Sequence, residues 1–251
     1  MSVTAKQLLT IFYSLKGSGA KNRVKDIYNE YASKHGKSKT DGKAWCSESV
    51  SAAFIKANAT NLINGIAQTA GSHVDHFKKL GIWHGGHNRT PKVGDVVIFQ
   101  DRHGKPNHTE MVFAVNEKKG TFTGLSGNYL GGIGLRTRKI HSSGIHGYGS
   151  PRYGNYKPVT TTLIESVMKG KYGTGSKVGT TRYNKLALEG YDPDLVQNKI
   201  NWVIDTAKAI KNGNPEAVKK YGNDQQRRDA LGAWYDIVQK QINVLYGIDK
   251  W

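Results

Sequence analysis

Three side chains of the sequence have the types and the chain order that a thiol hydrolase needs. Cys46 is the single cysteine of the 251 residues, and it opens a segment with helical apolar spacing. A helix N-terminus lowers a thiol pKa and favours the nucleophilic thiolate. His108, before an apolar strand, supplies a base, and Asn128, at the edge of the next strand, offers an amide oxygen to orient the imidazole. The alternative for Cys46 is a small buried hydrophobe, the usual role of a lone cysteine.

The elements that must position these residues follow from the spacing of apolar residues. Periodicity predicts helices over 4–15 and 22–35 and a third helix from Cys46 through Lys56. Short apolar runs bounded by turn residues predict strands at 96–100, 110–115 and 120–125. Helices followed by consecutive strands indicate an α+β domain with an antiparallel sheet.

Five motifs carry a resemblance to a known family. In chain order they are Trp45-Cys-Ser47, Pro91-x-Val-Gly-Asp-Val-Val-Ile-Phe99, Asn107-His108, Ser126-Gly-Asn128 and Gly147-Tyr-Gly-Ser-Pro151. Over residues 20–155 this series resembles the CHAP and NlpC-type amidohydrolases, papain-like cysteine hydrolases that cut peptidoglycan. The resemblance implies that Cys46 is the nucleophile, His108 the general base and acid, and Asn128 the orienting residue. It also implies that the Cys46 backbone N–H belongs to an oxyanion hole.

The sequence departs from the family pattern at several positions. Thr109 and Glu110 follow the histidine where many members have Val-Gly, and Ser126 stands where many CHAP domains have Glu. Asp95, in the family's Val-Gly-Asp turn, is expected to brace the entry to a strand. Some members bind calcium through an Asp-rich loop before the cysteine, but only Asp41 stands there, so neither calcium nor another cofactor is predicted.

The last third of the chain contains an internal repeat. Four blocks recur in the same order: Lys171-Tyr-Gly173 as Lys220-Tyr-Gly222, Arg182-x-x-x-Leu186 as Arg227-x-x-x-Leu231, Tyr191-Asp192 as Tyr235-Asp236, and Val196-Gln-x-x-Ile-Asn201 as Val238-Gln-x-x-Ile-Asn243. Val and Ile four residues apart face one core, so the blocks predict two short helical bundles.

These blocks resemble the Cpl-seven type of wall-binding repeat of phage lysins, a three-helix module. The resemblance implies wall contacts by Tyr172, Arg182, Tyr221 and Arg227, because aromatic faces stack on sugars and Arg pairs with carboxylates. The alternative is that both tyrosines fill small cores. The expected organisation is a catalytic domain at 1–155, a linker at 156–162, a first repeat at 163–204 and a second at 205–247.

Charge and composition narrow the classes of partner. The net charge is +18, of which +14 lies before residue 159, so the first part attracts polyanions. No nucleic-acid-binding motif is present and the second part lacks a dense cationic face, so nucleic acid is not expected. No apolar run approaches the ~20 residues of a membrane span, and no signal-peptide pattern follows the N-terminal apolar patch.

Two histidine pairs leave a metal alternative open. His73 and His76, and His84 and His87, have the spacing of helical zinc ligands. No carboxylate cluster accompanies either pair, so no metal site is predicted.

The motifs together predict a bacteriolytic enzyme of the phage endolysin type. It would be a cysteine peptidoglycan endopeptidase or an N-acetylmuramoyl-L-alanine amidase that acts as a monomer. It would be made in the host cytoplasm and released to the bacterial wall. The alternatives are a non-catalytic wall-binding or virion structural protein, and a transferase that uses an amine in place of water.

Overall fold

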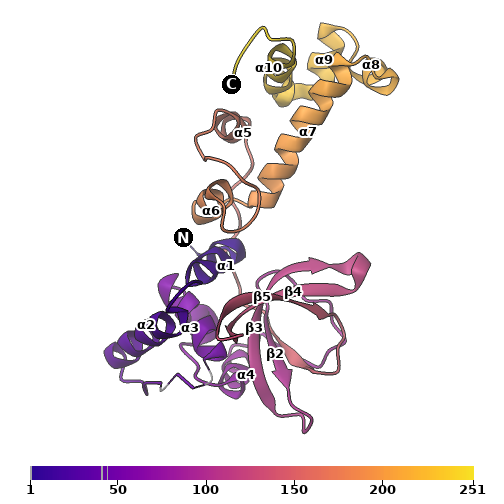
Figure 1. The fold of residues 1–251 in the computed structure, drawn as a ribbon. Helices are drawn as coiled ribbons and strands as arrows, with labels where there is room; N and C mark the ends of the chain where they lie inside the picture. The colour runs from indigo at the N-terminus through magenta and orange to yellow at the C-terminus, as the bar shows by residue number, and fades with distance from the viewer. Residues whose placement is uncertain (1, 41, 44) are drawn as a thin grey trace. The chain divides into compact units, whose positions relative to one another are not determined.

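The chain divides into two compact units between Asn155 and Tyr156 (Figure 1). The computed structural model describes residues 2–40, 42–43 and 45–251. The first unit combines helices with a sheet and the second is helical. The composition of the sequence shifts near the same point. Among the described helices, none is both long and apolar enough to cross a bilayer.

Among its described residues, the first unit has four α-helices. They are α1 (Ala5–Ser14), α2 (Ala20–Lys34), α3 (Cys46–Lys56) and α4 (Ala70–Lys79). The Thr4 side chain accepts from the Gln7 backbone N–H while the Gln7 side chain bonds back to Thr4, so a capping box starts α1. Helix α3 begins at Cys46, as predicted, whereas α4 was not predicted.

The described strands of the first unit form a six-stranded antiparallel sheet. Its strands are β1 (Trp83–Gly85), β2 (Val96–Gln100), β3 (Pro106–Asn116), β4 (Thr121–Tyr129), β5 (Gly132–Lys139) and β6 (Ile145–Gly149). They lie in the order β1-β6-β2-β3-β4-β5, with every neighbouring pair antiparallel. Mixed helices and an antiparallel sheet agree with the predicted α+β class. Strand β3 starts four residues earlier than the predicted 110–115, so His108 lies within the strand.

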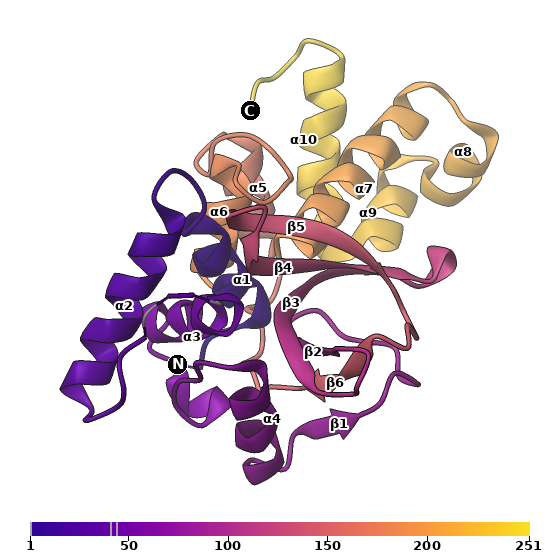
Figure 2. The same cartoon turned by 60° about the horizontal axis from the view of Figure 1, so that its bottom comes forward.

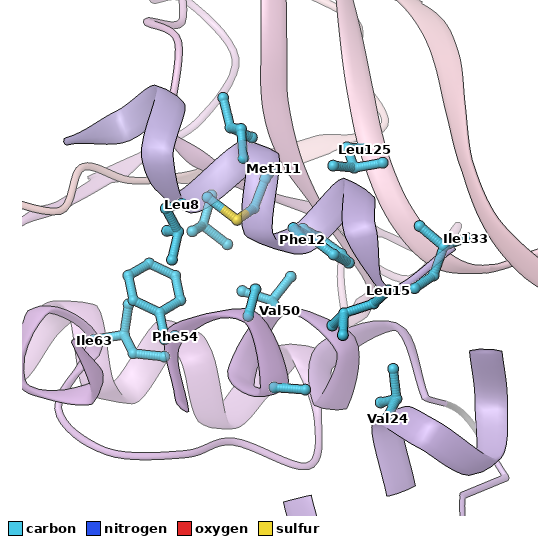
Figure 3. Close-up of a cluster of buried hydrophobic side chains, with 14 of the residues drawn as sticks. Leu8, Phe12, Leu15, Val24, Val50, Phe54, Ile63, Met111, Leu125 and Ile133 are labelled. Atoms are coloured by element: carbon cyan, nitrogen blue, oxygen red, sulfur yellow. The ribbon is translucent and has the colours of Figure 1, made fainter. Parts of the chain in front are cut away.

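The two faces of the sheet carry separate cores. Figure 2 shows α1 to α4 gathered on one side of the sheet. On that side Phe12 of α1, Val50 of α3 and Leu125 of β4 belong to one buried cluster (Figure 3). The opposite face has a smaller cluster that includes Val112 and Phe122. Because strand residues alternate between faces, β3 contributes to both clusters.

The second unit consists of six α-helices around one core. They are α5 (Thr161–Met168), α6 (Thr181–Leu188), α7 (Pro193–Lys211), α8 (Pro215–Tyr221), α9 (Asp224–Leu231) and α10 (Tyr235–Leu245). Helix α7 has 19 residues and starts at the Asp192 cap with Pro193 in its first turn.

The expected boundary between the repeats, 204/205, falls inside α7. Buried residues continue across this point at helical spacing, from Val203 to Ala207, and no Gly or Pro interrupts them. Val167, Val203 and Val238 belong to one hydrophobic cluster. The two repeat segments therefore share a helix and a core, because an uninterrupted apolar face propagates a helix.

Candidate functional site

Cys46 is held at the first turn of α3 by contacts to strand β4. The residue is 5% exposed. The Ser49 hydroxyl donates to the Cys46 carbonyl oxygen at 2.6 Å and accepts from the Gly127 backbone N–H at 3.0 Å. A Cβ at Gly127 would approach Ser49 and Trp45 to 2.6 Å, so only glycine allows β4 this close to the helix start. The position of the thiol is thus set by packing of α3 on the sheet.

The imidazole of His108 lies between the thiol and a buried carboxylate. His108 Nε2 is 3.1 Å from Glu110 Oε1, and the Cys46 thiol hydrogen-bonds to the same ring. The backbone of Thr109 also hydrogen-bonds to the thiol. Thiol, imidazole and carboxylate form one hydrogen-bonded series.

Glu110 is placed by three neighbouring strands. It is buried, and its carboxylate accepts from Arg138 Nε of β5 at 3.3 Å and from Nη2 of the same side chain. The Arg138 guanidinium lies 4.5 Å from the Phe99 ring centroid. A Cβ at Gly124 of β4 would lie 2.0 Å from Glu110 Oε2, so this glycine leaves room for the carboxylate. The buried charge is therefore paired, as a buried carboxylate requires.

The pKa values of the series favour a thiolate–imidazolium pair. Burial raises the pKa of the Cys46 thiol, but the hydrogen bond and charge of His108, with the Thr109 backbone, outweigh burial and lower it. Burial lowers the pKa of His108, yet Cys46 and Glu110 raise it to about 9. Burial also raises the pKa of Glu110, and His108 and Arg138 bring it below its usual range. The lowered pKa of the Cys46 thiol and the raised pKa of His108 both shift the pair toward its thiolate–imidazolium form.

Alkylation of Cys46 tests this charge state. Because its pKa is lowered, the rate of reaction with iodoacetamide is expected to rise at lower pH than for a free thiol, whose pKa is about 8.5. Mass spectrometry over a pH series measures the rate, with the urea-unfolded protein as the reference. In the His108→Asn variant, the pH at which the alkylation rate rises should move toward that of the unfolded protein. Identical profiles for folded and unfolded protein would contradict the ion pair.

Asn128 does not hold the orienting position predicted for it. It is exposed, with a left-handed φ of 62°, where β4 shifts register between Ser126 and Tyr129. Glu110 bonds to His108 Nε2, so the orienting contact belongs to Glu110. The sequence signal was present: Glu110 is two residues from His108, and alternation puts both on one face of a strand. Asn128 instead lines a cleft beside His108.

Asp95 braces the entry to β2, as expected. Its buried carboxylate accepts from the Lys92 backbone N–H, the Ser150 hydroxyl and Arg89 Nη2, each at 2.8 Å. These bonds tie the turn before β2 to the end of β6. The residue has a structural role.

The two residues of the first histidine pair, His73 and His76, differ in burial. His73 is buried, its Nε2 lies 3.3 Å from the Ser47 carbonyl oxygen, and burial lowers its pKa to about 4. His76 is half-buried. In the part of the chain that the structure describes, no three His, Cys, Asp or Glu residues are grouped to hold a metal ion. Asp41 lies outside the described residues.

The repeated blocks of the second unit build the same polar network twice. Arg182 Nε donates to the Gly173 carbonyl oxygen at 3.1 Å and Nη1 to Gln197 Oε1 at 3.4 Å, and Gln197 bonds to Asn201 at 2.8 Å. The second copy repeats these bonds, with Arg227 donating to Tyr221, Gly222 and Gln239, and Gln239 donating to Asn243. Each arginine thus links a Tyr-Gly segment by hydrogen bonds to a later helix, α7 in the first copy and α10 in the second.

The tyrosines of these blocks do not offer free faces. Tyr172 is 5% exposed and Tyr221 8%, and both pack in the core of the unit. The Tyr172 hydroxyl donates to Glu189 at 2.7 Å. The prediction that these rings stack on sugars is therefore wrong, and the alternative that they fill the core holds. A motif shows that an aromatic is needed, whereas only packing shows which way it faces.

Replacing Arg182 with alanine is expected to destabilise the second unit. The loss of its bonds to Gly173 and Gln197 should lower the free energy of unfolding by about 1–3 kcal/mol. Lys185→Ala on the same helix, at an exposed position, is the matched control and should stay within about 0.5 kcal/mol. Urea unfolding followed by tryptophan fluorescence measures both. Unchanged stability with weaker wall binding would instead place the guanidinium on the ligand.

Comparison with known proteins identifies one segment of the chain. Residues 161–204 match the CW_7 repeat, a cell-wall-binding repeat. The match spans α5, α6 and the first part of α7, and includes the Arg182 network. It indicates that the chain binds the cell wall. The first unit and the second expected repeat, 205–247, lie outside the matched residues. Comparison with curated proteins and with solved structures gives no significant match.

Proposed function

We propose that the first unit is a cysteine peptidoglycan hydrolase of the papain-like type, which the second unit holds on the bacterial wall. The observation that carries the proposal is the series Cys46, His108 and Glu110. Its members lie on α3 and β3 in the order nucleophile, base and orienter. The bond cut is an amide of the wall peptide, so the activity is that of an endopeptidase or an amidase. An endolysin combines these two functions.

The proposed reaction is acyl transfer through Cys46. The thiolate attacks the carbonyl carbon of the scissile amide and forms a tetrahedral oxyanion, which the Cys46 backbone N–H stabilises. Collapse breaks the C–N bond, and the leaving amine takes the proton of the His108 imidazolium. The neutral imidazole then removes a proton from water, whose oxygen attacks the thioester. The carboxylic acid leaves, and Cys46 and His108 return to their ionic form.

Glu110 and the charge of the protein support this reaction without touching the substrate. Glu110 fixes the ring that must face both the thiol and the leaving amine, and it stabilises the imidazolium. The excess of positive charge before residue 159 attracts an anionic wall polymer. Wall binding by the second unit raises the local concentration of substrate.

A suspension of purified Gram-positive walls tests the proposal. The protein is expected to lower the turbidity and to release one new amino group and one new carboxyl group per bond cut. Mass spectrometry of the fragments then identifies the bond. If the substrate lost is matched by a product in which an amine, and not water, has been joined to the acyl group, the protein is a transferase. Binding to several wall types without any new end groups would contradict hydrolysis and leave a wall-binding protein.

A further inference from the structure

A cationic cleft lies beside His108. Its volume is about 440 Å³, within the range of pockets that hold small ligands. Among the described residues that line it, none is Asp or Glu. The residues that line the cleft include Asn107, His108, Asn128, Tyr129, Arg136 and Arg138.

The two arginines of the cleft differ in what they already bind. They lie two residues apart on β5, opposite Gly124 and Phe122 of β4, and so face the same side of the sheet. Arg138 is engaged by the buried Glu110 carboxylate. Arg136 is exposed, its guanidinium lies 5.9 Å from the Tyr129 ring centroid, and no ion-pair partner for it occurs among the residues that the structure describes.

The described charges around the cleft do not neutralise the positive charge of Arg136. The Glu110 carboxylate is shared by His108 and Arg138, and the Cys46 thiol hydrogen-bonds to the His108 ring. Lys139, which also lines the cleft, adds a second exposed positive charge. An anion that enters the cleft therefore gains the attraction of Arg136 without displacing an internal partner. A guanidinium matches a carboxylate with two parallel hydrogen bonds.

We propose that Arg136 determines substrate specificity by binding a free carboxylate on the peptide residue next to the scissile amide. This inference rests on the proposed hydrolase function. The cleft shares His108 with the reacting groups, so its occupant is the segment that continues from the bond being cut. The side-chain amides of Asn107 and Asn128 suit the backbone of a peptide. These features favour a peptide carboxylate over the phosphate of a wall polymer.

Paired wall peptides test the inference. The two soluble substrates differ only in a carboxylate or a carboxamide on the residue next to the scissile bond. The wild-type protein is expected to prefer the acid by about 10- to 100-fold in kcat/KM. Arg136→Gln should bring this ratio close to one, mainly by raising KM for the acid, and Arg136→Lys should retain part of the preference. Lys118→Gln, at an exposed position outside the cleft, should keep the wild-type ratio.

A binding experiment separates failure of the inference from failure of the proposed function. In Cys46→Ala protein, the acid peptide should bind more tightly than the amide peptide, and the addition of Arg136→Gln should remove the difference. Hydrolysis of both peptides at equal rates, unchanged by Arg136→Gln, would overturn only the inference. No hydrolysis of walls or peptides and no binding preference would overturn both. Slower clearing of intact walls by Arg136→Gln, with unchanged peptide hydrolysis, would assign Arg136 to the wall polymer and reject the carboxylate role.

Discussion

Cys46→Ala is expected to reduce hydrolysis of wall peptide by about 10³-fold or more while wall binding is retained. The thiolate is the atom that forms the acyl intermediate, and the chain has no second cysteine that could replace it. Binding persists because the CW_7 repeat lies in the other compact unit. Turbidity and end-group release measure hydrolysis, and pull-down with walls measures binding.

The matched variant Cys46→Ser separates chemistry from packing. A hydroxyl fills nearly the same space at the start of α3 but remains protonated beside His108, so it should also be inactive. Thermal unfolding should show that both variants are folded. Clearing of walls by Cys46→Ala at the wild-type rate would reject Cys46 as the nucleophile.

Glu110→Gln is expected to lower kcat by about 10²- to 10⁴-fold, as loss of the orienting carboxylate does in related triads. The amide no longer stabilises the imidazolium and can present its N–H₂ group to His108 Nε2. Asn128→Ala is the comparison variant, because Asn128 is exposed and Glu110 already bonds to His108 Nε2. Its kcat should stay within about threefold of wild type, since its loss breaks no contact to the reacting groups, whereas its KM should rise because Asn128 lines the proposed peptide cleft.

The pH profile gives Glu110→Gln a second readout. The His108 pKa of about 9 places the alkaline limb of kcat/KM near that pH, because the imidazolium loses its proton as the pH rises through its pKa. Removal of the Glu110 charge lowers the His108 pKa, so the limb should move to lower pH. Thermal unfolding and wall pull-down check that the variant folds. A large loss in Asn128→Ala with little loss in Glu110→Gln would return the orienting role to Asn128.

The elements with strong local signals were predictable from the sequence. Helix α1 and strand β2 lie within a residue of their predicted bounds, and α3 starts at Cys46. In each case the signal is contained in the segment itself, as a cap or as apolar periodicity. Strands β1, β5 and β6 were missed because they are short or rich in glycine, and only pairing with neighbours makes them strands.

The candidate nucleophile and base were evident from sequence, but the orienting residue was not. Cys46 and His108 stand out by residue type and by the elements that carry them. Glu110 orients the ring only because Arg138 comes from β5 and Gly124 leaves space on β4. Arg138 and Gly124 lie 28 and 14 residues after Glu110 in the chain, and strand pairing alone brings them beside it.

In the second unit, too, the sequence determined the local elements but not the contacts between them. The repeated blocks and their helices were determined by the sequence, because a preserved order of motifs at helical spacing requires a preserved local structure. The direction of the Tyr172 and Tyr221 rings, the bonds of Arg182 and the continuity of α7 were decided by packing around a shared core. Residue types and periodicity are properties of a segment, whereas burial and partners depend on which other segments the fold brings beside it.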